Sequence, residues 1–81
     1  MKILITGVAG FIGFSFAKYL LEKKKYKIVG LDNLNDYYDV NLKKKRIKKL
    51  FKSNRFKFYK IDIKEKLKIE KIFKHNKIDF I

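Results

Sequence analysis

The sequence contains no cysteine, no proline and no tryptophan. Without cysteine the chain can form no disulfide, no thiolate metal site and no cysteine nucleophile. His75 is the only histidine, so a metal site built from several histidines is also excluded. The absence of proline, of glycine- and serine-rich stretches and of internal repeats leaves no sign of a linker. We therefore expect the 81 residues to belong to one small domain.

Long apolar runs are also missing. No stretch approaches the roughly 20 apolar residues that a membrane-spanning helix needs. The opening segment, Met1–Leu21, is rich in apolar residues, but three glycines interrupt it and Lys18 lies within it. It is not followed by the small-residue cleavage site of a secretory signal peptide. We expect a cytoplasmic protein with no membrane partner.

Acidic residues are scarce: eight Asp and Glu stand against 22 Lys and Arg, and the net charge is +14 at pH 7. A charge of this size is typical of proteins that bind nucleic acid or anionic membranes. However, only Arg46 and Arg55 carry the planar guanidinium that suits bidentate recognition of phosphates and bases. The charge therefore comes almost entirely from lysine.

The lysine excess has an explanation that involves no ligand. Lys, Ile, Asn, Phe and Tyr, which can all be encoded with A and T alone, make up 49 of the 81 residues, as expected of a low-GC genome. We interpret most lysines as solvated surface and expect no specific nucleic-acid partner. The alternative is a small basic nucleic-acid-binding protein, which predicts clustered arginines and exposed aromatic rings. Here Phe and Tyr fall largely on positions that we expect to be buried.

The hydrophobic pattern alternates between strand-like and helix-like segments, which is typical of an α/β protein with a parallel sheet. We expect strands at Lys2–Thr6, Tyr26–Leu31, Phe56–Ile61 and Ile78–Ile81, and helices at about Phe11–Lys24, Val40–Phe51 and Lys64–Asn76, with a polar loop at Asp32–Asp39. The expected buried stripes of the three helices are Ile12, Phe16, Tyr19 and Leu20, then Val40, Ile47, Leu50 and Phe51, then Ile69, Ile72 and Phe73.

This β-α-β-α-β-α-β order predicts an incomplete Rossmann-type, doubly wound parallel sheet with strand order 3-2-1-4. The last expected strand begins at residue 78, and no crossover helix follows it. We therefore expect residues 1–81 to be the truncated N-terminal part of a single Rossmann-type domain.

The strongest chemical signal is the segment Thr6–Gly13, TGVAGFIG, between the first strand and the first helix. Gly7 permits the tight bend out of the strand, and Gly10 lets the backbone approach a pyrophosphate without a Cβ in the way. Gly13 lets the helix pack closely, and Ala17 one turn later keeps that contact small. The free N–H groups and the positive end of the helix then face the anion.

A second signal is Asp32, which lies at the end of the second strand and 19 residues after Gly13. A carboxylate in this place can accept hydrogen bonds from both hydroxyls of the adenosine ribose. It would repel a 2′-phosphate, and no arginine stands beside it in the sequence. These residues favour NAD over NADP as the cofactor.

With these motifs the chain resembles the extended short-chain dehydrogenase/reductases that act on nucleotide sugars, the NAD-dependent epimerases and dehydratases. The stretch Asp32–Leu50, especially DNLNDYYDVNLKK, is similar in particular to the UDP-glucuronate 4-epimerases of capsular polysaccharide biosynthesis. The resemblance runs over essentially the whole chain, which corresponds to perhaps a quarter of such an enzyme. It implies a homodimeric parent whose bound NAD takes a hydride from C4 of a UDP-sugar and returns it to the other face. A dehydratase or decarboxylase of the same superfamily is the alternative within the family.

The resemblance also implies roles for individual residues. The pyrophosphate loop would be Gly7, Gly10, Phe11, Ile12 and Gly13. Asp32 and Asn33 would contact the ribose, and Asp62 and Ile63 would flank the adenine, the aspartate accepting from its amino group. Asp36, Tyr37 and Lys43 are further candidates for the adenosine side.

The catalytic tyrosine and lysine of such enzymes have no counterpart at the expected place, so the 81 residues alone are expected to be inactive. Tyr19 and Lys23 match the Tyr-x-x-x-Lys spacing, but we interpret the tyrosine as part of a buried helical stripe. His75 is expected near a helix C-terminus, where a cation suits the helix dipole. Lys64 and Glu65 replace the usual capping residue of the third helix, which should weaken that cap by about 1 kcal/mol.

Overall fold

The computed structural model describes residues 1–34 and 39–81 of the chain. In these residues three strands alternate with three helices, in the order β1 (Lys2–Thr6), α1 (Phe11–Glu22), β2 (Lys27–Asp32), α2 (Val40–Leu50), β3 (Phe56–Lys60) and α3 (Lys66–His75). The α/β class is therefore as predicted, with element boundaries shifted by one or two residues. The second strand extends through Asp32, which places that carboxylate at the last position of β2.

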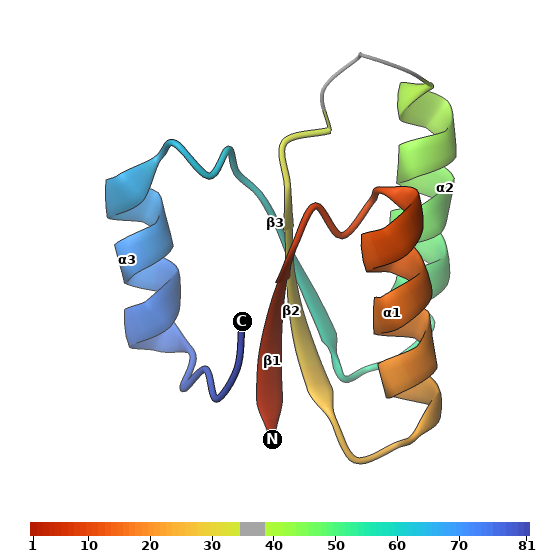
Figure 1. Cartoon of the computed structure of the whole chain (residues 1–81), viewed down its shortest axis with the longest axis horizontal. Helices are drawn as coiled ribbons and strands as arrows, with labels where there is room; N and C mark the ends of the chain where they lie inside the picture. Colours follow the sequence, from red (N-terminus) through yellow and green to blue (C-terminus); the bar gives the residue numbers. More distant parts are fainter. Residues whose placement is uncertain (35–38) are drawn as a thin grey trace.

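The three strands form one parallel sheet in the order β1-β2-β3. Helices α1 and α2 cover one face of the sheet and α3 covers the other, so the molecule has three layers (Figure 1). Because all strands run the same way, their carboxyl ends share one edge of the sheet, which is where ligands bind in folds of this type.

Each face of the sheet has its own apolar core, because neighbouring residues of a strand point to opposite faces. Toward α1 and α2 the buried cluster includes Ile5, Ile28 and Phe56, and toward α3 it consists of Leu4, Val29, Leu31 and Ile72. The central strand β2 is buried over five of its six residues, from Ile28 to Asp32. This double coverage explains why β2 is a nearly continuous apolar run.

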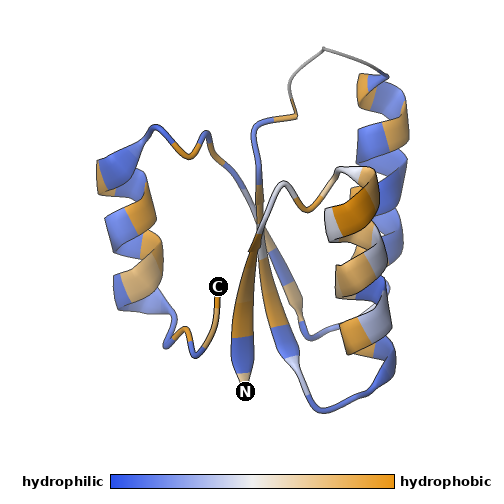
Figure 2. Cartoon of the chain, viewed as in Figure 1, coloured by the Kyte–Doolittle hydropathy of each residue, from blue (hydrophilic) through white to orange (hydrophobic). Residues whose placement is uncertain are grey.

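The buried face of α1 differs from the prediction. Ala17, Leu20 and Leu21 are its buried residues, whereas Ile12, Phe16 and Tyr19 are 82, 51 and 55% exposed. The helix is apolar nearly all round (Figure 2), so its periodicity alone does not show which side faces the sheet. The close approach of Gly13 to the glycine loop sets the rotation of the helix, so that of the predicted stripe Leu20 is buried and the other three residues face outward.

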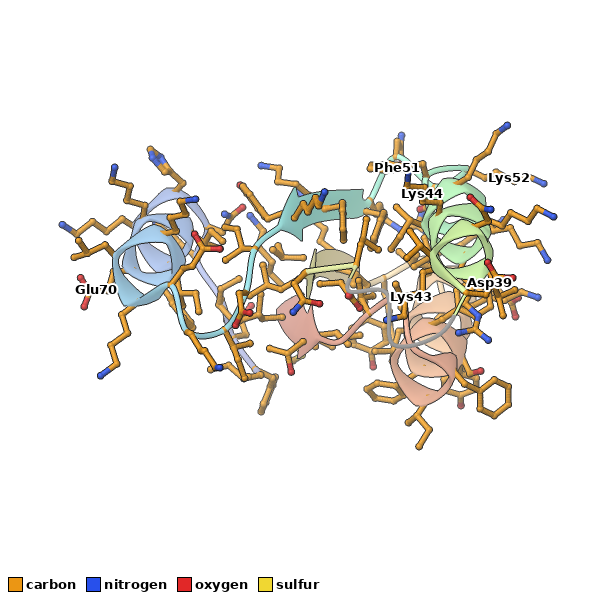
Figure 3. The ribbon with its side chains drawn as sticks, turned by 90° about the horizontal axis from the view of Figure 1, so that it is seen from above. Asp39, Lys43, Lys44, Phe51, Lys52 and Glu70 are labelled. Atoms are coloured by element: carbon orange, nitrogen blue, oxygen red, sulfur yellow. The ribbon has the colours of Figure 1, made fainter. Side chains whose placement is uncertain are left out.

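Helix α2 buries one face and, apart from Lys43, leaves its lysines exposed to solvent. Ile47, Leu50 and Lys43 are buried, while Phe51, predicted to be buried, is 54% exposed and packs edge-on against Phe56 with ring centroids 5.1 Å apart. In Figure 3, Lys43 lies on the inner side of α2, whereas Lys52 points away from it. Asp39 caps the N-terminus of the helix, and its carboxylate accepts hydrogen bonds from the backbone amides of residues 41 and 42, at 2.9 and 3.2 Å.

Helix α3 is fastened at its C-terminal end. As predicted, no side chain caps its N-terminus, where Glu65 is the cap residue, and His75 lies in its last turn. Phe73, predicted to be buried, is 39% exposed. The 1% exposed Asn76 follows the helix, and its amide donates to the Tyr59 hydroxyl at 3.3 Å and to the carbonyl of residue 72 at 3.0 Å. These hydrogen bonds attach α3 to β3.

The predicted fourth strand is reduced to a single bridge. Phe80 pairs in parallel with Ile3 on the free side of β1, and the amide of Leu4 donates to the Phe80 carbonyl at 2.8 Å. The neighbouring Asp79 turns its carboxylate to the backbone amide of Lys2, also at 2.8 Å. A segment paired with one neighbour at one position does not build a ladder, so the sheet of the described residues has three strands rather than four.

Many of the aromatic side chains predicted to be buried are exposed. Phe11, Phe16, Tyr19, Phe51, Phe73 and Phe80 have 39 to 70% of their surface accessible. Phe16 and Phe80 lie against the free edge of β1, a part of the sheet that no further strand of the described chain covers. Burial of aromatics therefore does not argue against a nucleic-acid partner. Among the described residues no helix is long and apolar enough to span a membrane.

Candidate functional site

The glycine loop between β1 and α1 has the geometry that its spacing predicts. Gly7 adopts φ = +63°, a left-handed conformation that costs a residue with a side chain more than it costs glycine. A Cβ on Gly13 would lie only 2.4 Å from the Gly7 carbonyl oxygen. Gly7 thus forms the bend, and Gly13 lets the first turn of α1 rest directly on it.

Backbone hydrogen bonds attach this loop to the end of β2. The amide of Val8 donates to the Leu31 carbonyl at 3.1 Å, and the amide of Ala9 donates to Oδ2 of Asp32 at 2.9 Å. The amide of the next residue, Gly10, donates back to the Gly7 carbonyl at 3.0 Å. Val8 and Ala9 are fully buried, so the loop is held in one conformation by the protein itself.

The N-terminus of α1 is left open by this arrangement. Its cap residue is Gly10, which has no side chain to accept from the helix, and the first turn carries no acidic residue. Phe14 is the first residue whose amide donates within the helix, to the Gly10 carbonyl at 2.9 Å. In the described part of the chain, the amides of Phe11, Ile12 and Gly13 have no protein acceptor. Three N–H groups and the positive helix end therefore face outward together.

Asp32 is the buried carboxylate of the site, at 8% exposure. Its Oδ2 accepts from Ala9, and its Oδ1 accepts from the amide of Leu34 at 2.8 Å. A carboxylate has about four lone-pair positions, so each oxygen keeps a second one for a ligand hydroxyl. The two backbone donors fix the orientation of the carboxylate.

Asn33 and Asp62 connect the ends of β2 and β3. The side-chain amide of Asn33 donates to Oδ2 of Asp62 at 3.3 Å, and the amide of Lys64 donates to its Oδ1 at 2.9 Å. The Lys64 amide, and secondarily Asn33, hold the pKa of the Asp62 carboxyl below its ordinary value of 3.8. Asp62 is therefore an ionised acceptor near neutral pH.

The predicted site residues line two hollows at the carboxyl edge of the sheet. The first, here called the strand-end hollow, measures about 300 Å³ and is lined by Thr6, Gly7, Leu31, Asp32, Asn33, Ile61, Asp62 and Ile63. The second, the loop hollow, is open, measures about 660 Å³ and is lined by Ile5, Thr6, Gly7, Gly10, Phe11, Ile12, Gly13 and Phe16. Thr6 and Gly7 line both, so the two hollows adjoin and together include all nine predicted site residues.

Another hollow of about 560 Å³ lies at the opposite end, between the C-terminal ends of α1 and α2. It is open, and its lining includes three lysines and Arg55. We place the site at the other edge, because ligands of parallel α/β sheets bind beyond the carboxyl ends of the strands. This distant hollow is called the basal hollow below.

Three other predictions have mixed outcomes. Lys43 is 5% exposed and lines neither of the two hollows at the carboxyl edge. Asp36 and Tyr37 lie outside the described residues. Tyr19 is exposed rather than buried, and the ammonium of Lys23 stacks on its ring at 4.7 Å from the centroid. This pair lies at the C-terminal end of α1, where Lys23 is the cap residue, far from the glycine loop.

One residue of the site region was not predicted from the sequence. Arg46 of α2 donates to the carbonyl of Ala9 in the glycine loop at 3.0 Å. The contact could not be predicted because the two positions are 37 residues apart in the sequence, and no periodicity or motif connects them. An arginine thus contacts the loop that holds Asp32, although none stands beside Asp32 in the sequence.

A parallel sheet with helices on both faces, a glycine turn into an open helix N-terminus and a carboxylate ending the second strand define a Rossmann-type unit. A model of the GDP-mannose 4,6 dehydratase family matches residues 4–81, and the chain belongs to that family.

Individual relatives are more specific. The chain is 51% identical over 70 residues to the UDP-glucuronate 4-epimerase of Thermodesulfobacterium geofontis. The aligned region covers 86% of this chain and 21% of that protein. The crystal structure of UDP-glucuronic acid 4-epimerase from Bacillus cereus in complex with UDP-glucuronic acid and NAD matches with a TM-score of 0.87 and 35% identity, over 100% of this chain and 25% of that one. The dTDP-glucose 4,6-dehydratase of Bacillus anthracis in complex with NAD matches with a TM-score of 0.82 and 32% identity, over 96% and 24%. The chain spans about a fifth of the length of the curated relatives it matches.

The close contact between Gly13 and the Gly7 carbonyl predicts how a methyl group added at Gly13 changes the stability of the fold. Alanine favours a helix over glycine by about 1 kcal/mol, so propensity alone would make Gly13→Ala stabilising. Because its Cβ would meet the Gly7 carbonyl oxygen, we expect a net destabilisation of about 1–3 kcal/mol in thermal unfolding. Ser15→Ala, on the exposed side of the same helix, is the control and should stay within about 0.5 kcal/mol. A raised melting temperature for Gly13→Ala would contradict the close contact.

The Asn33–Asp62 hydrogen bond predicts a change in titration. Since a carboxyl with a lowered folded pKa contributes stability above its unfolded pKa, this contribution is lost as the pH falls below about 3.8 and through the folded value. Asn33→Ala should move the pKa of Asp62 upward, toward 3.8, in a carboxyl-carbon NMR titration. Asn54 is an exposed asparagine that precedes β3, at the opposite end of the strands from Asp62, and Asn54→Ala should leave the pKa of Asp62 unchanged. An unaltered Asp62 titration in Asn33→Ala would show that the hydrogen bond does not form in solution.

Proposed function

We propose that the chain binds NAD as part of a nucleotide-sugar epimerase that acts by transient hydride transfer at C4 of a UDP-sugar, with UDP-glucuronate as the substrate. The observation that carries the cofactor assignment is Asp32, held by two backbone amides at the end of β2 and beside an open helix N-terminus. The substrate assignment rests on the similarity to the UDP-glucuronate 4-epimerases named above.

The residues present fit the two ends of an ADP group. The pyrophosphate would accept from the amides of Phe11, Ile12 and Gly13, whose outward direction and partial positive charge suit an anion. This places the phosphates in the loop hollow, where Gly10 offers no Cβ to obstruct the backbone. Since the chain supplies these donors from its backbone, no cationic side chain is required at this position.

The adenosine would occupy the strand-end hollow. Asp32 would accept from the two ribose hydroxyls through its remaining lone pairs, with Asn33 beside it. Asp62 would accept from the adenine amino group, and its lowered pKa keeps it in the acceptor form that this contact requires. Ile63 is 65% exposed, so its side chain is accessible to cover one face of the base.

When bound, NAD supplies the hydride acceptor and donor of the reaction. The part of the work that these 81 residues would do is to bind and orient it: the glycine loop and the first turn of α1 fix the phosphates, and Asp32 fixes the ribose. Tyr19 and Lys23 do not meet at the carboxyl edge of the sheet, so we assign them no catalytic role. The residues that bind the sugar and move protons would lie in the other four-fifths of an enzyme of the relatives' length.

The finer features of the whole protein belong to the same proposal. The bridge at Phe80 marks the position that a fourth strand would take beside β1, consistent with the order 3-2-1-4. We also propose that the parent is a homodimer, as the family resemblance implies, and that it is cytoplasmic, as expected from the sequence. A dehydratase is the second candidate, because the B. anthracis dTDP-glucose 4,6-dehydratase has the same fold over nearly the whole chain.

Binding and turnover test this function together, in the complete product of the reading frame that carries the chain. Charge-assisted hydrogen bonds from Asp32 to the ribose contribute about 1.5–3 kcal/mol, so Asp32→Asn should weaken NAD binding by about 10- to 150-fold. The unchanged protein should prefer NAD to NADP, and Asp32→Asn should reduce this preference. Both dissociation constants are measured by calorimetry, and Asp79→Asn, a carboxylate at the opposite end of β1, is the control.

Turnover is followed by chromatography of UDP-glucuronate incubated with the same protein and NAD. The C4 epimer is the expected product, and a 4-keto-6-deoxy sugar formed from a 6-hydroxylated nucleotide sugar would favour the dehydratase. NADP bound as tightly as NAD by the unchanged protein would overturn the cofactor assignment.

A further inference from the structure

Arg46 connects α2 to the glycine loop. Its guanidinium donates to the Ala9 carbonyl at 3.0 Å, and its central carbon lies 5.9 Å from the ring centroid of Phe11 and 6.0 Å from that of Phe14. Both rings belong to the first turn of α1. A planar guanidinium that hydrogen-bonds in its own plane and packs on aromatic faces suits this position better than an ammonium does.

The carbonyl that Arg46 holds belongs to a fully buried residue whose amide is also engaged. The N–H of Ala9 donates to Oδ2 of Asp32 at 2.9 Å, and its C=O accepts from Arg46. The loop is therefore held on one side by the carboxylate at the end of β2 and on the other by a cation from α2. Loss of the Arg46 hydrogen bond would remove one of the two contacts that fix Ala9, whose amide orients Asp32.

Arg46 has no ion pair among the described residues, where the single salt bridge joins Glu65 and Lys68. Its positive charge, which persists at every accessible pH, is met by a carbonyl and two ring faces instead of a carboxylate. The carbonyl that Arg46 contacts belongs to the loop residue whose amide donates to Asp32. Its place next to this carboxylate points to a role in the site beyond stability.

On the basis of the NAD function proposed above, we propose that Arg46 is a positioning residue for cofactor selectivity. By holding the Ala9 carbonyl it keeps the Ala9 amide on Asp32, and so keeps that carboxylate turned toward the ribose hydroxyls. The same contact holds the first turn of α1, and its three outward amides, beside the loop. The preference for NAD over NADP then depends on a residue that touches neither cofactor hydroxyl.

The chain provides a matched control in its only other arginine. Arg55 is also partly buried and also donates from its guanidinium to backbone carbonyls, those of Tyr26 at 3.3 Å and of Leu21. It lines the basal hollow, at the opposite end of the sheet. Removing Arg55 therefore removes a comparable packing and hydrogen-bonding contribution without touching the glycine loop.

The test compares Arg46→Ala, Arg46→Lys and Arg55→Ala in the complete product of the reading frame. Dissociation constants for NAD and NADP are measured by calorimetry and melting temperatures by circular dichroism. Because Asp32 would no longer be oriented, Arg46→Ala should weaken NAD binding about tenfold and lower the NAD-to-NADP preference by about fivefold or more. Arg46→Lys keeps the charge and one donor but not the planar stacking, so its preference should fall about threefold. Arg55→Ala should lower the melting temperature with the preference unchanged.

An NAD preference that is the same in Arg46→Ala, Arg55→Ala and the unchanged protein overturns the proposal, whatever the melting temperatures. If Arg46→Ala does not fold, Arg46→Lys decides: a reduced preference at an unchanged melting temperature supports the positioning role, and an unchanged preference overturns it. The unchanged protein separates this inference from the function on which it rests. If it binds neither dinucleotide, both fail, whereas NAD-selective binding with unaltered Arg46 variants overturns the role of Arg46 alone.

Discussion

The hydrogen bond between the amide of Ala9 and the carboxylate of Asp32 is the contact on which the site depends. It joins the glycine loop that follows β1 to the last residue of β2. Because Ala9 is fully buried and Asp32 nearly so, breaking the bond would leave the buried Ala9 amide without an acceptor and Asp32 with the Leu34 amide alone, which costs more than the loss of an exposed hydrogen bond. The conformation of the loop and the orientation of the carboxylate are therefore set together.

Much of this site could be predicted because each residue has a local physical reason. The positive φ of Gly7 and the close approach at Gly13 require glycine wherever the chain folds in this way, so the spacing alone indicates them. The run of apolar residues in β2 similarly follows from its burial on both faces. A carboxylate at the end of that strand must then lie at the edge where the strand ends meet.

The features that could not be predicted depend on contacts between elements that are far apart in the sequence. Helix α1 is apolar on nearly every side, so its pattern did not reveal that Tyr19 would be exposed, although the spacing of Gly13 and Ala17 correctly indicated close packing there. Arg46 reaches the loop from 37 residues away, and only the packing of α2 against α1 brings them together. The segment Ile78–Ile81 has the composition of a strand, but in the described residues its backbone pairs with β1 at one position only. Composition does not show whether a neighbouring strand is present to pair with it.

A crystal structure of the complete product of the reading frame, from crystals grown with NAD, is the most direct test of this site. We expect the adenosine in the strand-end hollow, with both ribose hydroxyls within hydrogen-bonding distance of Asp32, and the pyrophosphate at the amides of Phe11, Ile12 and Gly13. The Ala9 amide should stay on Asp32 and its carbonyl on Arg46. A dinucleotide in the basal hollow, or a ribose that does not contact Asp32, would contradict the central claim.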